Sequence, residues 1–162
     1  MASIALGHYD CQKKTDNLRF SMAKIQVSRD FNHSAAVVWA LLDDFGDISW
    51  APGIDKIEVI GEGIGMIRRL HLKGMEPIDE QLSFKDAANM SFGYDIPTGI
   101  PLPMTDYSAK AQVTAIDDSH CHVDWYGQAT PVGCSDEEAE QILKSTYDML
   151  LQWVDDALSQ PA

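Results

Sequence analysis

The chain has 162 residues, of which 45% are hydrophobic and 23% are charged. These values are typical of one globular domain that buries a sizeable core. The formal net charge of −13 argues against a nucleic-acid or anionic-membrane partner, because phosphate binding requires clustered Lys and Arg. No run of about eighteen apolar residues predicts a transmembrane helix, and the N-terminus lacks the basic and apolar regions of a signal peptide.

The three cysteines, Cys11, Cys121 and Cys134, are odd in number and lack the spacing of metal ligands. They predict reduced thiols in a cytosolic protein. No metal and no cofactor are expected.

The first part of the chain predicts a tail, a strand and two short helical segments. Residues 1–23 show no regular period and predict an N-terminal tail. Residues 24–31 alternate between apolar and polar side chains and predict a strand with one buried face. Residues 35–42 predict a short helix, and residues 43–50 predict a second short helix or a turn, which Pro52 ends.

The middle of the chain alternates strand patterns with turn signals. A loop over residues 97–103 contains three prolines, which exclude it from a ladder or a helix. Consecutive strands with short turns favour antiparallel pairing. The predicted strands cover residues 55–60, 64–72, 77–84, 90–96, 106–116 and 120–128.

Residues 135–158 predict one long amphipathic helix. Ser135 and Glu138 form a capping-box pattern at its start, and at 1.5 Å per residue the helix would be roughly 36 Å long. Such a helix needs a large apolar partner, which the strands supply, so an α+β fold is expected. The predicted apolar stripe consists of Ala139, Ile142, Leu143, Thr146, Met149, Leu150, Trp153 and Ala157.

Alternation along the strand over residues 106–116 places small side chains toward the helix, Ala109, Ala111 and Ala115 among them. Small side chains would leave room for a cavity, but they would equally allow the helix to pack closely on the sheet. Both interpretations stay open. In the cavity interpretation, the opposite wall comes from the middle of the helix, with Leu143, Thr146, Tyr147 and Leu150.

Arg68 and Glu80 lie on otherwise apolar faces of neighbouring strands, and the face that carries Glu80 also includes Leu82 and Phe84. On the next strand, Phe92 and Tyr94 share one face. A lone buried charge is very costly but a hydrogen-bonded pair is tolerated, so we expect these two side chains to pair inside. The pair is either a structural ion pair or a polar anchor for the carboxylate, phenol or carbonyl of a ligand. Tyr94, Tyr107 and Trp125 are expected nearby.

Two further motifs are set aside. Gly61-x-Gly63-x-Gly65 lies between two strands without a following helix, so the phosphate-binding geometry of a dinucleotide loop is absent. His120 and His122 share a strand face but have no third ligand at a suggestive spacing.

Nine short segments stand in a characteristic order along the chain: residues 36–39, 43–46, 50–52, 63–68, 80–82, 94–96, 101–103, 107–109 and 123–125. Together they resemble the polyketide cyclase/dehydrase and lipid-transport family. This family belongs to the START-like (SRPBCC) superfamily of the birch-pollen allergen. The resemblance implies a helix-grip fold, with a seven-stranded antiparallel sheet curved around the C-terminal helix and a cavity between them. It also implies binding of apolar or aromatic small molecules, and for some members polyketide cyclisation, but it carries no universal catalytic residues.

Three functional hypotheses follow for a single START-like domain over residues 24–159. The first is a cytosolic module that binds a hydrophobic or aromatic small molecule, lipid- or polyketide-like, between sheet and helix. The second is an enzyme of the cyclase or dehydratase type, in which Arg68 polarises a carbonyl and Glu80 or Tyr107 moves a proton. The third is a structural or protein-interaction domain with a filled core, and an exposed apolar patch on the helix would favour a homodimer.

Overall fold

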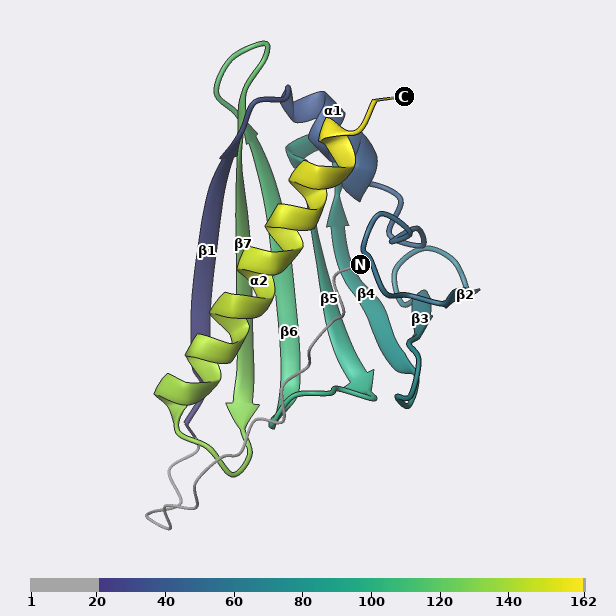
Figure 1. Cartoon of the computed structure of the whole chain (residues 1–162), viewed down its shortest axis with the longest axis vertical. Helices are drawn as coiled ribbons and strands as arrows, with labels where there is room; N and C mark the ends of the chain where they lie inside the picture. Colours follow the sequence, from purple (N-terminus) through teal and green to yellow (C-terminus); the bar gives the residue numbers. More distant parts are fainter. Residues whose placement is uncertain (1–20, 162) are drawn as a thin grey trace.

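The computed structural model describes residues 21–161 of the chain. The elements follow the order of a helix-grip fold, with one short helix after the first strand and one long helix at the end (Figure 1). They are β1 (Ala23–Phe31), α1 (Ala35–Leu42), β2 (Lys56–Ile60), β3 (Ile67–His71), β4 (Ile78–Asp86), the 3-10 turn η1 (Ala87–Asn89), β5 (Ser91–Thr98), β6 (Met104–Ala115), β7 (Cys121–Pro131) and α2 (Asp136–Ser159).

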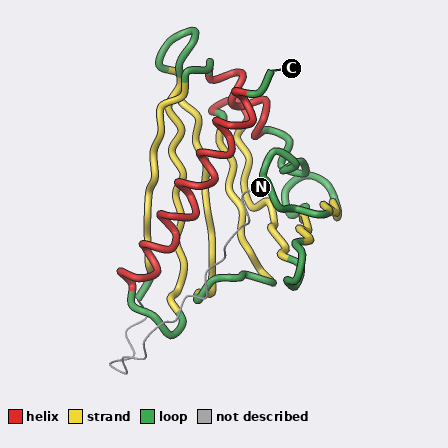
Figure 2. The backbone as a smooth tube through the Cα atoms, in the orientation of Figure 1, coloured by secondary structure: helices red, strands yellow, loops and turns green. Residues whose placement is uncertain are grey.

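The seven strands form one antiparallel sheet in the order β1-β7-β6-β5-β4-β3-β2. Neighbours in sequence from β2 to β7 are therefore neighbours in space, and β1 pairs with β7 along its whole length, from Ala23↔Ala129 to Phe31↔Cys121. Helix α2 crosses one face of the sheet diagonally, and α1 lies beyond the end of the strands near the C-terminal end of α2 (Figures 1 and 2). The predicted fold class is confirmed.

Helix α2 begins with the predicted capping box. The Ser135 hydroxyl accepts the Glu138 N–H at 3.1 Å, and the Glu138 carboxylate accepts the Ser135 N–H at 2.8 Å, so two backbone donors at the helix start are satisfied. The predicted apolar stripe is partly wrong, because Met149 is 36% exposed. The buried side chains of α2 are Ala139, Ile142, Leu143, Tyr147, Leu151 and Val154.

Residues 43–50 form a series of turns, so the second short helix is wrong and the alternative of a turn is right. Two aspartates explain the outcome. The Asp44 carboxylate accepts the Gly46 N–H at 3.2 Å, and the Asp47 carboxylate accepts the Ser49 N–H at 2.9 Å. These side-chain bonds offer the backbone an alternative to helical hydrogen bonds.

Several strand boundaries differ from the prediction. β5 continues to Thr98, so Pro97 lies in a strand and not in the predicted loop over residues 97–103, and β7 continues to Pro131. Two further differences have a clear cause. The strand expected from residue 64 begins at Ile67, because Met66 N–H closes a turn onto the Gly63 carbonyl and Gly65 adopts a φ of 93°. Phe84, expected to face inward, is 39% exposed. The β4–β5 register shifts between Leu82 and Phe84, and such a bulge reverses the alternation of faces beyond it.

The main core lies between the sheet, α1 and α2, and a second apolar cluster around Leu70 and Ile78 joins β3 and β4 to the turns before β2. Trp153 of α2 packs against this second cluster, so the helix contacts both. Within residues 21–161 no helix is both long enough and apolar enough to span a membrane. Residues 1–20 of the predicted tail (residues 1–23) lie outside the described residues. Ala23, the last residue of the predicted tail, is the first residue of β1.

Candidate functional site

Arg68 and Glu80 form an ion pair on the face of the sheet that is covered by α2. The two residues are cross-strand partners on β3 and β4, and they are 4% and 9% exposed. Arg68 Nε donates to Glu80 Oε2 at 2.5 Å. The predicted internal pair is therefore confirmed.

The Arg68 guanidinium has further protein partners. Its Nη1 donates to the Phe45 carbonyl at 2.9 Å, and its Cζ lies 4.1 Å from the centre of the Phe45 ring and 5.6 Å from that of Tyr94. Both distances allow a cation–π interaction. The mechanism in which Arg68 polarises a substrate carbonyl would have to displace some of these contacts.

Three tyrosine hydroxyls meet beside this pair, one each from β5, β6 and α2. The Tyr107 and Tyr147 hydroxyl oxygens are 2.8 Å apart, and those of Tyr94 and Tyr107 are 3.4 Å apart. All three side chains are buried. The sequence brings them together because two lie on inward positions of adjacent strands and the third lies on the covered face of the helix.

Burial is the main influence on these hydroxyls. It raises the pKa of Tyr94 to about 12, with a further contribution from the Glu80 carboxylate. It also raises the pKa of Tyr107 well above its ordinary value and that of Tyr147 in the same direction. Desolvation disfavours the charged phenolate, so all three hydroxyls keep their protons at neutral pH and act as hydrogen-bond donors. Tyr107 therefore has almost no phenolate form at neutral pH that could accept a proton.

Trp125 on β7 completes the polar group. Its side chain is 1% exposed, and its ring lies 6.3 Å from that of Tyr147 and 6.4 Å from that of Tyr94. Burial raises the pKa of the Tyr94 hydroxyl, and the hydrogen-bonding influence of the Trp125 indole N–H lowers it by a smaller amount. The indole N–H nevertheless has no hydrogen bond of good geometry to any residue from 21 to 161.

The other predicted site residues also lie between sheet and helix. Ala109, Ala111 and Leu143 are buried, and Leu150 is half-buried against the main core. Thr146 is half-buried, and its hydroxyl donates to the Ile142 carbonyl of its own helix at 2.9 Å, so it has no proton left to donate to a ligand.

The two interpretations of the small residues can be compared at Gly127. A Cβ atom built on Gly127 would lie 1.8 Å from the Tyr147 hydroxyl oxygen, so helix and sheet pack closely at this point. Whether a ligand opens more room elsewhere along the interface stays a prediction.

Sequence reasoning missed two aromatic neighbours of the site. Phe92 lies on the predicted inward face of β5 and contacts the rings of Tyr94 and Trp125, with centroids 6.1 and 5.9 Å away. Phe45 contacts Arg68 from the turns after α1. Alternation was a sufficient signal for Phe92, whereas the turns around Phe45 gave no period from which to place it.

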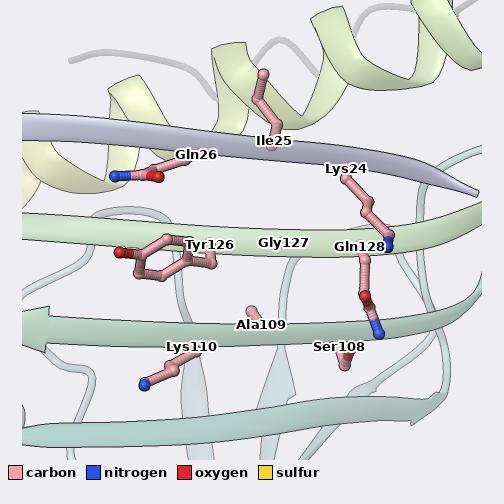
Figure 3. Close-up of a pocket in the computed structure, with 9 residues that line it drawn as sticks. All are labelled: Lys24, Ile25, Gln26, Ser108, Ala109, Lys110, Tyr126, Gly127 and Gln128. Carbon is pink, nitrogen blue, oxygen red and sulfur yellow. The ribbon is translucent and has the colours of Figure 1, made fainter.

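A shallow depression of about 420 Å³ lies on the opposite face of the sheet. Figure 3 shows the outward side chains of β1, β6 and β7 around it, while Ile25, Ala109 and Gly127 lie between them, with the Ile25 side chain on the core face of the sheet. Ala109 is the one predicted site residue that touches it. Its lining comprises Lys24, Ile25, Gln26, Ser108, Ala109, Lys110, Tyr126, Gly127 and Gln128.

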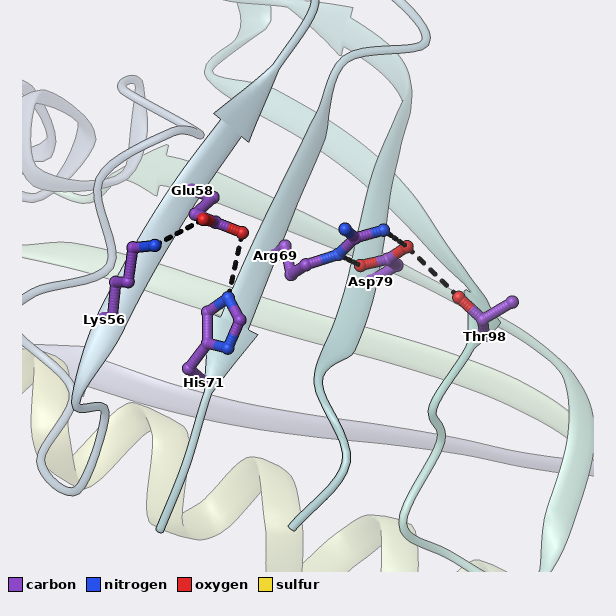
Figure 4. A network of polar contacts seen from close by, with 6 residues as sticks. All are labelled: Lys56, Glu58, Arg69, His71, Asp79 and Thr98. Carbon is purple, nitrogen blue, oxygen red and sulfur yellow. Dashed lines mark hydrogen bonds and ion pairs between the residues drawn. The ribbon is translucent and has the colours of Figure 1, made fainter.

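The same outer face carries a polar network on β2 to β5 (Figure 4). Arg69 forms two hydrogen bonds with Asp79, at 2.7 and 2.9 Å, and these hold the pKa of Asp79 below its ordinary value. His71 contacts Glu58 at 2.9 Å. Arg69 and Asp79 directly follow and precede Arg68 and Glu80 in sequence, so alternation sends one ion pair outward and the other inward.

The imidazole of His122 is held by acids rather than by a second histidine. Its Nδ1 lies 2.5 Å from Asp30 and its Nε2 lies 3.2 Å from Asp124. In the part of the chain that the structure describes, no group of three or more His, Cys, Asp or Glu side chains is arranged to hold a metal ion.

Comparisons with known proteins agree with this architecture. The family model described as "Polyketide cyclase / dehydrase and lipid transport" matches residues 22–157. No curated protein matches the sequence.

Several solved structures are similar. An uncharacterized protein from Bacillus thuringiensis is 28% identical, with 85% of this chain and 100% of that chain covered and a TM-score of 0.76. The protein XoxI from Bacillus cereus is 28% identical over 84% of this chain and 95% of that chain, with a TM-score of 0.74. Norcoclaurine synthase from Thalictrum flavum, in complex with dopamine and hydroxybenzaldehyde, is 16% identical over 93% and 99%, with a TM-score of 0.69. This last likeness concerns the fold alone.

Proposed function

Because this chain belongs to the polyketide cyclase/dehydrase and lipid transport family, we propose that it binds a hydrophobic or aromatic small molecule between the sheet and α2. One observation supports this site above others. Buried polar groups of Arg68, Glu80, Tyr94, Tyr107 and Trp125 converge inside an otherwise apolar interior. Ligand sites commonly combine apolar walls with a few convergent polar groups.

The position of the apolar walls supports the same site. Ala109 and Ala111 on β6 and Leu143 on α2 belong to the same buried core, and Leu150 packs against it, so these residues are candidates for the apolar walls. The aromatic rings of the interior have an apolar body and a polar edge, which suits aromatic ligands.

Native mass spectrometry and dye displacement test the proposal directly. Purified protein should retain a bound mass under native conditions, or a fluorescent apolar dye should bind and be displaced by lipids or polycyclic aromatic compounds. The absence of both uptake and displacement across such a panel would refute it.

A pair of α2 variants locates the site. Leu150→Trp would fill space on the side of the helix that faces the sheet, whereas Met149→Trp places the same ring on an exposed position one residue away. We expect dye binding to fall at least tenfold in the first variant and to stay unchanged in the second. Equal effects of the two substitutions would show that the dye binds elsewhere.

An enzymatic role has weaker support. Arg68 is held by Glu80 and Phe45, and the raised pKa of Tyr107 keeps its hydroxyl protonated at neutral pH, where it cannot accept a proton as a base. Binding without chemistry is therefore the function that we propose. A cytosolic location and a homodimer remain predictions, and light scattering of the full chain would test the latter.

A further inference from the structure

Two rows of outward side chains border the shallow depression on the outer face of the sheet (Figure 3). Each row crosses β1, β7 and β6, and its members are cross-strand partners. Lys24 begins the first row and Lys110 ends the second, so the two lysines stand at diagonally opposite corners. The space of about 420 Å³ is within the range of small-molecule sites. The rows are Lys24, Gln128 and Ser108, and Gln26, Tyr126 and Lys110.

The two lysines share a property that is uncommon in this acidic chain, which has 25 Asp and Glu but 12 Lys and Arg. Within residues 21–161, every Arg forms an ion pair with an acid, and so does every Lys other than Lys24, Lys73 and Lys110. Two of these three remaining lysines border one depression. The lining of this depression contains no Asp or Glu, so positive charge gathers there.

The contacts that the two lysines do form are weak. Lys110 Nζ lies 5.6 Å from the centre of the Phe84 ring, and a cation–π interaction at an exposed site contributes little. Its charge is also the smallest of several influences that change the pKa of Asp86. The Glu140 carboxylate accepts the backbone N–H of Lys24 at 3.4 Å and forms no ion pair with its ammonium group. Both ammonium groups can therefore turn to an anion at little cost.

Acidic side chains begin just beyond the depression. Asp95 is the cross-strand partner of Ser108 on β5 and extends the first row. Asp124 precedes Tyr126 by two residues on β7, where side chains of β1 donate hydrogen bonds to it. A ligand with several negative charges would approach these carboxylates, whereas a single charge between the lysines would not. The surroundings therefore favour a monoanion.

We propose that this depression is a second binding site, which takes an organic monoanion with a flat apolar body. Strands about 4.8 Å apart and a rise of about 3.4 Å per residue place the Cα atoms of Lys24 and Lys110 about 12 Å apart, so two extended side chains reach one charged group near the centre. The apolar body lies against the Tyr126 ring, which is 37% exposed, and against the aliphatic parts of the lysines. The site is separate from the interior between the sheet and α2.

Three probes separate the charge from the apolar body. They are 2-naphthoate, which has both, 2-naphthamide, which is neutral and of the same size, and acetate, which has the charge alone. NMR titration of the full chain in about 0.15 M salt should show binding about tenfold weaker for the amide and for acetate than for 2-naphthoate, since each exposed ion pair contributes roughly two- to fivefold in affinity. The naphthalene protons should show nuclear Overhauser contacts with the exposed ring of Tyr126.

Variants assign the effect to the two lysines. Lys24→Gln and Lys110→Gln should each weaken binding of 2-naphthoate about two- to fivefold and leave binding of 2-naphthamide unchanged. Lys73→Gln is the matched control, because it removes the same charge from an exposed lysine in the turn between β3 and β4. Three strand spacings separate β3 from β6, about 14 Å, which exceeds the Debye length of about 8 Å, so this variant should bind like the wild type.

Equal binding of 2-naphthoate and 2-naphthamide by the wild type would overturn the proposal, and so would an equal loss in all three lysine variants. Absence of any binding of 2-naphthoate would overturn it as well. Contacts of the probe with the buried rings of Tyr94, Tyr107 or Tyr147, and not with Tyr126, would show that it binds in the interior. That result would refute the outer site and support the function proposed above.

Discussion

Replacing Gly127 with alanine should destabilise the fold strongly, because the Tyr147 hydroxyl occupies the space that a side chain would need. A Cβ atom at this position would lie 1.8 Å from the hydroxyl oxygen and 2.5 Å from Cζ, whereas real Cβ atoms essentially never approach another atom within 3.0 Å. The clash cannot be relieved by a small rotation of α2, since Leu143 and Leu151 pack the helix against the core on both sides of Tyr147.

The expected cost has two parts. Overpacking a core typically costs about 1–3 kcal/mol. Moving Tyr147 also breaks its 2.8 Å contact with Tyr107, and a typical hydrogen bond contributes roughly 0.5–1.5 kcal/mol. We therefore expect Gly127→Ala to lower the free energy of unfolding by about 2–4 kcal/mol. Urea denaturation followed by circular dichroism would measure it.

A double-mutant cycle tests the stated cause. Tyr147→Phe removes the atom closest to the new methyl group but leaves ring carbons within 2.6 Å, so rescue should be partial. The double variant should be more stable than the sum of the two single effects predicts, by about 1 kcal/mol. A loss below about 0.5 kcal/mol in Gly127→Ala, or strict additivity in the cycle, would refute the reasoning.

Three other outcomes can be checked by the same denaturation experiment. Arg68→Met should cost about 3–5 kcal/mol because it leaves the Glu80 carboxylate buried without its partner, and the double variant Arg68→Met/Glu80→Leu should be clearly more stable than Arg68→Met; the opposite order would refute this. Ser135→Ala should cost about 1 kcal/mol through loss of the helix cap, and no loss would contradict the capping box. The hydrogen bond with Asp30 raises the pKa of His122, so its stabilising effect is full below about pH 6.5 and is lost as the pH rises through the raised value. The wild type should therefore lose more stability than His122→Gln between pH 6 and pH 9, and parallel pH profiles would contradict this.

Alternation with a period of two predicted which side chains lie inside at most of the sheet positions that form the site. It correctly sent Arg68 and Glu80 inward and Arg69 outward, because successive side chains of a strand point to opposite faces. It also placed Tyr94 on the buried face and separated Trp125 from its exposed neighbour Tyr126. The argument failed at Phe84, where a bulge adds a residue that no sequence period reveals.

The rotation of α2 could be predicted only approximately. The apolar stripe included Met149 and left out Tyr147, which was expected only in the wall of a cavity, yet Met149 is exposed and Tyr147 is fully buried. The helix is rotated so that Tyr147 meets the bare backbone of Gly127 and the hydroxyl of Tyr107. These partners are 20 and 40 residues distant in sequence, so their contact depends on tertiary packing and not on the helical period. The position of the Phe45 side chain was missed for a related reason, since side-chain hydrogen bonds determine the turns around it.

The geometry of the tyrosines separates what holds the interior together from what can respond to a ligand. Tyr147 is fixed from two sides, by the slot at Gly127 and by its short contact with Tyr107, so these groups belong to the framework that joins α2 to the sheet. Tyr94 is joined to them by the longer contact of 3.4 Å and lies beside Trp125, whose ring centre is 6.4 Å away. A ligand that formed a hydrogen bond with the Tyr94 hydroxyl would therefore replace only the long Tyr94–Tyr107 contact. The Tyr107–Tyr147 contact, and with it the position of α2, would stay in place. An interior can be closely packed at one position and still offer a binding group at another, and this is why close packing at Gly127 does not argue against the proposed ligand site.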